Sequence, residues 1–225
     1  MNKRNINKTI KILVLFFSAF FLHGCLNFTQ VTTIKKDKTG SMFIHWQYNW
    51  ISGKDSLEAE RMYFFHKDSI KSLFSSKHIT IESIEVYKDL NDSTIHGKIE
   101  FDFDNFDSLK TAEAFSYGDF GITENDDGTE TFSQHVQPFI SSFGAASKNK
   151  IIYVFYLPGK ILKHNADKIS RNKLTWEFSG EKLSKSLLMK AVYKPFNLKE
   201  TPRIIYYLTV FVLLIVIIFL FYKRK

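Results

Sequence analysis

The feature that most constrains this chain is a segment of nineteen uncharged residues, 204–222, followed at once by the basic residues 223–225. As an α-helix this segment would rise about 28 Å, close to the thickness of the hydrocarbon core of a bilayer. The basic tail would lie on the cytoplasmic side. We therefore expect a transmembrane helix over 204–222 and a cytoplasmic tail over 223–225. A buried core helix is the alternative, but it needs a much larger protein around it.

The N-terminus has the pattern of a secretory signal. A cationic start is followed by the apolar run Ile12–Leu22 and then by Gly24 and Cys25. This run would rise only about 16 Å as a helix, which is too short for a permanent membrane span. We therefore expect residues 1–24 to be a cleaved signal peptide and residues 25–200 to form one domain outside the cytoplasm.

The four residues Leu22-His23-Gly24-Cys25 resemble the lipobox of bacterial lipoproteins, with a leucine three positions before an invariant cysteine. This resemblance implies that Cys25 is the lipid attachment site and the mature N-terminus. His23 departs from the pattern, in which a small residue is usual. An ordinary buried thiol or a signal-anchor residue is the alternative for Cys25. It cannot form an internal disulfide, because the chain has 1 Cys.

The positive charge of the chain lies mostly at its ends. The formal net charge is +8, but residues 1–25 and 204–225 carry seven of the 31 cations and no carboxylate. The intervening part is therefore close to neutral. This distribution argues against a nucleic-acid-binding domain, in which cations would cluster on the folded part.

Alternating apolar residues predict strands along most of the domain. The segment 42–50 alternates most clearly, since Met42, Ile44 and Trp46 share one face while Phe43 and His45 share the other. With the segment 28–37 it predicts a hairpin about Gly40. Further strands are expected at 79–87, 94–103, 151–157, 174–178 and 187–193, with another strand pair about residues 126–128.

Helices are expected between these strands. Asp55 and Glu58 have capping-box spacing and predict a helix to Phe65. A short helical face follows at 70–74, and an apolar stripe predicts another helix over 106–115. We assign no structure to 138–147. Hairpins with intervening helices indicate an α+β fold, in which an antiparallel sheet has helices packed on one side. The cleaved N-terminal signal and the C-terminal transmembrane helix complete this expectation.

The layout of the chain resembles the LppM-type bacterial lipoproteins. The resemblance rests on the cysteine before a strand, the turn 37–41, the segments 158–168 and 172–178, and the final helix with its basic tail. It covers about the first 30 mature residues and the last 70. It implies an extracytoplasmic α+β domain tethered by a C-terminal helix, and lipid or glycolipid interaction has been proposed for a mycobacterial member. The stretch 55–76 has no clear counterpart.

Few residues point to catalysis or metal binding. The seven histidines are scattered without the spacing of a helical metal motif, and a second cysteine for a zinc site is absent from the sequence. Glu100, Asp102 and Asp104 would project from one strand face, as a carboxylate pair or as the solvated face of a strand. We find no nucleophile elbow, phosphate loop or dinucleotide motif, and we expect no cofactor.

We therefore expect a non-enzymatic lipoprotein domain that binds a membrane lipid or an envelope protein at the outer face of the cytoplasmic membrane. The alternative is a cell-envelope hydrolase or metal-dependent enzyme that uses Glu100, Asp102 or Asp104 with His96 or His135. The two differ in one structural feature, because an enzyme requires those carboxylates to converge with a histidine in a concave pocket. A third possibility is an assembly factor whose helix 204–222 is itself the contact.

Overall fold

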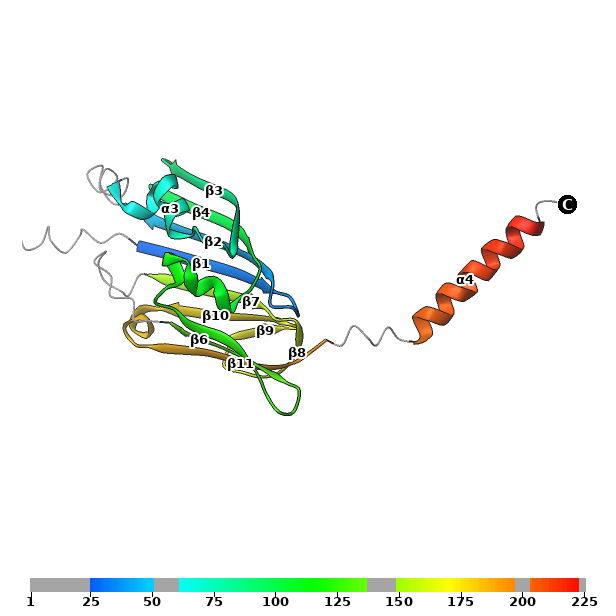
Figure 1. Cartoon of the computed structure of the whole chain (residues 1–225). Helices are drawn as coiled ribbons and strands as arrows, with labels where there is room; N and C mark the ends of the chain where they lie inside the picture. Colours follow the sequence, from blue (N-terminus) through cyan, green and yellow to red (C-terminus); the bar gives the residue numbers. More distant parts are fainter. Residues whose placement is uncertain (1–24, 51–60, 137–148, 197–202, 223–225) are drawn as a thin grey trace, which may run out of the picture.

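The computed structural model describes residues 25–50, 61–136, 149–196 and 203–222. Two sheets dominate it (Figure 1). The seven-stranded sheet has the order β3-β4-β2-β1-β7-β10-β9, and the four-stranded sheet has the order β5-β6-β11-β8. The strands are β1 (Cys25–Ile34), β2 (Gly40–Asn49), β3 (Ile79–Asp89), β4 (Thr94–Phe103), β5 (Asp119–Glu124), β6 (Glu130–Val136), β7 (Lys150–Tyr156), β8 (Gly159–His164), β9 (Lys168–Ser170), β10 (Lys173–Ser179) and β11 (Leu187–Pro195).

The expected hairpins form. β1 pairs with β2, β3 with β4, and β5 with β6, each antiparallel. In the first turn Lys38 has a left-handed backbone, with φ of 64°. The Asp37 carboxylate stabilises this turn, because it accepts hydrogen bonds from the backbone N–H and the hydroxyl of Thr39, at 3.1 and 2.8 Å. Local sequence signals thus place the strand pairs that are neighbours along the chain.

An aromatic core lies between the two sheets. Phe132 of the small sheet lies 4.5 Å, between ring centroids, from Phe155 of the large sheet. Phe106, in the segment after β4, contacts both rings as well as Phe120. Phe106, Phe132 and Phe155 are all buried. The core is therefore the space between two sheets, and it is filled mainly by phenylalanine.

The expected α+β architecture, an antiparallel sheet with helices on one side, is wrong. The inner face of the large sheet is covered by a second sheet, and β1 pairs with β7 in parallel. The predicted helix over 106–115 is replaced by two 3₁₀ turns, η2 (Asp107–Thr111) and η3 (Glu113–Phe115). The buried Phe106 and Leu109 face the core as predicted, but the segment joins the two sheets through 3₁₀ turns instead of a regular helix.

The remaining helical elements are short, apart from the last. The expected helix at 70–74 is α3 (Lys67–Leu73), preceded by η1 (Tyr63–Phe65). Most of the helix expected over 55–65 lies outside the described residues, as do the signal peptide 1–24 and the unassigned segment 138–147. Another 3₁₀ turn, η5 (Gly180–Ser184), precedes β11. β8 and β9 were not expected from the sequence.

A helix also forms at the C-terminus, α4 (Arg203–Tyr222), and Figure 1 shows it apart from the two sheets. Judged by length and hydropathy together, none of the helices in the described part of the chain qualifies to cross a membrane. This finding corrects the expectation of a transmembrane helix over 204–222.

Candidate functional site: an apolar pocket between the sheets

A cavity of about 530 Å³ opens where the cover of the large sheet is incomplete. Its floor is the inner face of β1, β2 and β7, including Phe28, Ile44 and Ile151. One wall comes from η1 and α3, and the other from η3, the start of β5 and the end of β6. The volume lies within the range of small-molecule sites. The cavity exists because α3 and the small sheet cover different parts of the same face.

The walls are mainly aromatic and aliphatic. Eight aromatic residues line the cavity beside aliphatic residues of β1, β2 and α3. They are Phe28, Trp46, Phe64, Phe74, Phe115, Tyr117, Phe120 and Tyr153. The Trp46 indole is fixed by its N–H, which donates to the Phe64 carbonyl oxygen at 3.1 Å. Such walls favour an apolar ligand, because burying apolar surface is the main source of binding free energy there.

Two polar side chains lie side by side in the floor. Gln30 of β1 and Tyr153 of β7 are partners in the parallel register, and both line the cavity. Gln30 is only 5% exposed, and its Nε2 donates to Thr32 Oγ1 at 3.0 Å. Burial raises the pKa of the Tyr153 hydroxyl to about 12. Tyr153 therefore keeps its proton at physiological pH and can donate a hydrogen bond into the cavity.

The opening of the cavity is more polar. Tyr117, at 89% exposure, and the exposed Ala114 lie at its edge. His135 is at the same edge, and its Nδ1 lies 2.7 Å from the Asp119 carboxylate. His135 is the one lining residue in the described part of the chain that can carry a positive charge, and no carboxylate is among the lining residues described. The interior therefore does not match an ionised ligand.

Cys25 begins β1 next to Leu26, which lines the cavity. Its backbone is paired with Asn49. The Leu26 N–H donates to Asn149 Oδ1 at 2.9 Å, so the start of β1 is held to the segment before β7. The chain leaves the domain at the other end, where Pro195 pairs with Gly159. The predicted lipid attachment residue and the cavity therefore lie at the same end of the domain.

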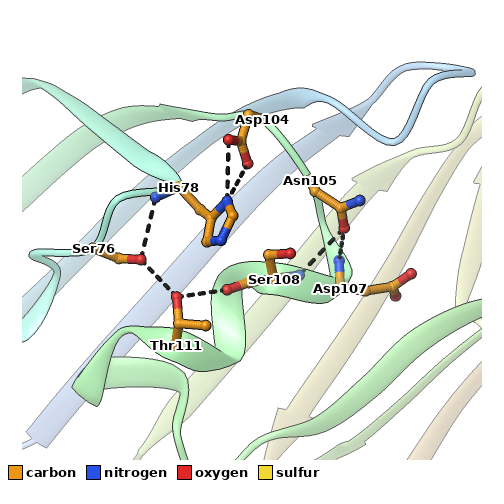
Figure 2. A network of polar contacts seen from close by, with 7 residues as sticks. All are labelled: Ser76, His78, Asp104, Asn105, Asp107, Ser108 and Thr111. Carbon is orange, nitrogen blue, oxygen red and sulfur yellow. Dashed lines mark hydrogen bonds and ion pairs between the residues drawn. The ribbon is translucent and has the colours of Figure 1, made fainter.

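The predicted carboxylate row does not form a site. Glu100 and Asp102 are exposed, on the face of β4 that points away from the cavity. Asp104 follows the strand and accepts hydrogen bonds from His78 Nδ1 at 2.8 and 3.1 Å (Figure 2). The neighbouring Ser76 hydroxyl binds the backbone N–H of His78, not its ring. Among the residues that the structure describes, the row therefore lacks the nucleophile–base contact that a hydrolase needs.

The two histidines considered for the enzyme lie elsewhere. His135 is paired with Asp119, as described above. His96 lies on the outer face of the large sheet, stacked between His45 and Tyr87, with ring centroids 5.2 and 4.7 Å away. Within the described residues, no group of three or more potential metal ligands comes together.

Hydrogen bonds define the tautomers of His45 and His96 on the outer face of the large sheet. The Thr94 hydroxyl donates to Asp92, so His96 Nε2 must donate to Thr94 Oγ1, 2.7 Å away. His96 Nδ1 is then the acceptor for His45 Nε2–H, at 3.0 Å. Burial lowers the pKa of both histidines, and the nearby Lys98 lowers both further. Both rings are therefore neutral at pH 7 and form one chain of hydrogen bonds.

The sequence predicted none of the cavity residues as a site. One signal was available, because Leu26, Phe28 and Ile34 share a face of β1 on which Gln30 and Thr32 are polar. A buried amide on an otherwise apolar strand face indicates either a hydrogen-bond network or a ligand.

The chain matches no known family model, and the search of curated proteins found no match. Among solved structures, it is similar to the NMR structure of the folded domain of the LppM protein of Mycobacterium tuberculosis. The TM-score is 0.50 at 13% sequence identity, and the match covers 80% of this chain and 95% of that domain. The two-sheet domain described here is therefore similar in fold to the LppM domain.

Proposed function

We propose that this protein is a non-enzymatic lipoprotein whose domain binds a membrane lipid in the cavity between its sheets. The observation that carries the proposal is the cavity of about 530 Å³ with its mainly aromatic and aliphatic walls. Cavities of this volume and polarity hold small apolar ligands. The fold similarity to the LppM domain supports the lipoprotein part of this proposal.

The lining residues favour binding over catalysis. None of the described lining residues is a serine, threonine, cysteine or carboxylate. A covalent hydrolase needs such a nucleophile next to a base. The described walls therefore offer contact area for a ligand. The His135–Asp119 pair at the edge has no serine, threonine or cysteine beside it among the described lining residues.

We further propose that the protein is attached to the outer face of the cytoplasmic membrane through a lipid on Cys25. This attachment would bring the cavity end of the domain to the bilayer, since Leu26 already lines the cavity. A ligand could then pass between membrane and cavity over a short distance. The other form of the proposal is that this end of the domain binds an envelope protein.

Photo-crosslinking of the full chain in its own membranes tests the cavity. Cells are fed a fatty acid with a diazirine in the chain, irradiated, and the protein is digested for mass spectrometry. We expect adducts on lining residues such as Phe115 and Ile151. Ala114→Trp places bulk at the opening from an exposed position and should reduce these adducts at least fivefold. Thr123→Trp, an equally exposed position on β5 away from the cavity, is the matched control.

Adducts spread over the whole surface, or equal adducts in both tryptophan variants, would refute lipid binding in the cavity. A separate measurement tests Cys25. Radiolabelled palmitate should be incorporated into the wild-type protein and not into Cys25→Ser. Unchanged labelling in that variant would refute lipid attachment at this thiol and would leave the cavity result untouched.

A further inference from the structure

The floor of the cavity contains two neighbouring side chains whose hydrogen-bonding groups an alkyl chain cannot satisfy. Gln30 and Tyr153 are neighbours across the β1–β7 pairing, on the face that lines the cavity. The bond from Gln30 Nε2 to Thr32 Oγ1 uses one of the two amide N–H groups. It leaves the amide carbonyl as an acceptor, and the Tyr153 hydroxyl is both donor and acceptor.

Gln30 and Tyr153 lie deeper in the cavity than the polar residues at its opening. Gln30 is 5% exposed, whereas Tyr117 at the edge is 89% exposed. A methyl end group packed against Gln30 would leave its carbonyl without water and without a partner, which is unfavourable for a buried amide. A hydroxyl or carboxyl end group would instead give and accept hydrogen bonds there. The floor is thus complementary to a polar end group.

The same floor does not match an ionised group. Lysine and arginine are absent from the described lining residues, and His135 is at the opening next to Asp119. A carboxylate or phosphate moved to Gln30 would lose its hydration without gaining a cation. A neutral group keeps the hydrogen bonds without this cost.

We propose that Gln30 and Tyr153 bind the uncharged polar end of a single-chain lipid, a hydroxyl or a protonated carboxyl, which enters the cavity head-first. This inference rests on the proposed function, because it concerns the same cavity. It adds the chemical class of the ligand and the direction in which the ligand enters the cavity. The alkyl chain then follows the aromatic walls toward the opening.

The positions of crosslinks on the full chain, in membrane vesicles, show in which direction the ligand enters the cavity. The probe is a long-chain primary alcohol with a diazirine two carbons from its hydroxyl. A second probe has the same chain and diazirine but ends in a methyl group. Head-first binding places the alcohol probe's adducts on floor residues, Ile44 and Ile151. We expect the alcohol to label them about tenfold more than the methyl probe, as one hydrogen-bonded group would give.

Gln30→Leu and Tyr153→Phe should each remove most of that preference. Gln47→Leu makes the same change on the outer face of β2, outside the cavity, and should keep this preference. Tyr153→Phe removes a single oxygen, so it tests the idea even if Gln30→Leu does not fold.

Two outcomes would overturn the inference. Alcohol adducts confined to Tyr117 and His135 would mean tail-first entry, and equal floor labelling by the two probes would mean that the polar pair does not recognise the ligand. In both, lipid binding in the cavity still holds. Absence of cavity adducts with every probe, the fatty acid included, would refute the proposed function itself.

Discussion

The two faces of the seven-stranded sheet come from the same strands but depend on different interactions. The inner face is apolar and is covered by the small sheet around Phe106, except where the cavity opens. The outer face carries polar side chains such as His45, His96 and Lys98, which form hydrogen bonds and ring stacks. Stability should therefore depend on close packing on the inner face and on charge and pH on the outer face. Four predictions test this difference.

The largest effect is expected from Phe106→Ala. Phe106 is 1% exposed and contacts phenylalanines of both sheets, so its removal leaves a cavity between them. We expect a loss of about 3–5 kcal/mol in the free energy of unfolding, measured by urea denaturation. Phe196→Ala removes a ring that is 53% exposed and is the control. Similar losses in the two variants would contradict an aromatic core between the sheets.

Gly97→Ala should have the next largest effect. An added Cβ at Gly97 would lie 2.4 Å from the Trp46 indole, which lines the cavity and is bound to the Phe64 carbonyl. Overpacking of this kind costs about 1–3 kcal/mol. Tryptophan fluorescence should also change, because the indole has to move. Gly121→Ala, where the nearest atom is an Asp107 carboxylate oxygen at 3.1 Å, should change both measurements much less.

A smaller effect on the outer face should depend on pH. Burial holds the pKa of His45 and His96 below the ordinary value of 6.5. The unfolded chain therefore binds protons first as the pH falls below about 6.5, and the folded state loses stability in that direction. The Asp92 and Asp89 carboxylates partly oppose this for His96, while Lys98 reinforces it for both.

The measurement is the Tm between pH 7.5 and 5.5. Replacing both histidines with glutamine should make the fall in Tm shallower. Phe43→Leu, on the same face of β2, removes a ring but no titratable group and should leave the slope unchanged. An unaltered slope in the double glutamine variant would argue against the neutral histidine pair.

The smallest effect is expected at Glu177. Its carboxylate lies 2.6 Å from Lys168 and 3.9 Å from Lys150, but these ammonium groups are largely exposed. The hydrogen bond from Lys168 lowers the pKa of Glu177, so its small contribution is present above the ordinary carboxyl pKa and is lost as the pH falls. Glu177→Gln should therefore lower the Tm slightly at low salt. The difference should vanish at 1 M salt, where surface charges are screened.

Much of the strand pattern could be predicted from the sequence, whereas its arrangement could not. Alternation along 42–50 and the turn signals near 91–93 and 126–128 gave the correct hairpins, because these depend on nearby residues. The apolar stripe of Phe106 and Leu109 was assigned to a helix, yet the same two residues suit a pair of 3₁₀ turns between sheets. An apolar stripe shows which residues are buried, but it does not show whether they belong to an α-helix or to a pair of 3₁₀ turns.

The amino-acid sequence by itself determined which residues face inward along each strand, because side chains alternate with a period of two. It also determined the near-neutral charge of the central part and the place of Cys25 before the first strand. Only the tertiary structure decided that β7 lies parallel to β1, which sets Tyr153 beside Gln30. The physical reason is that pairing between distant strands depends on the whole packed core, so no local pattern specifies the cavity or its polar floor.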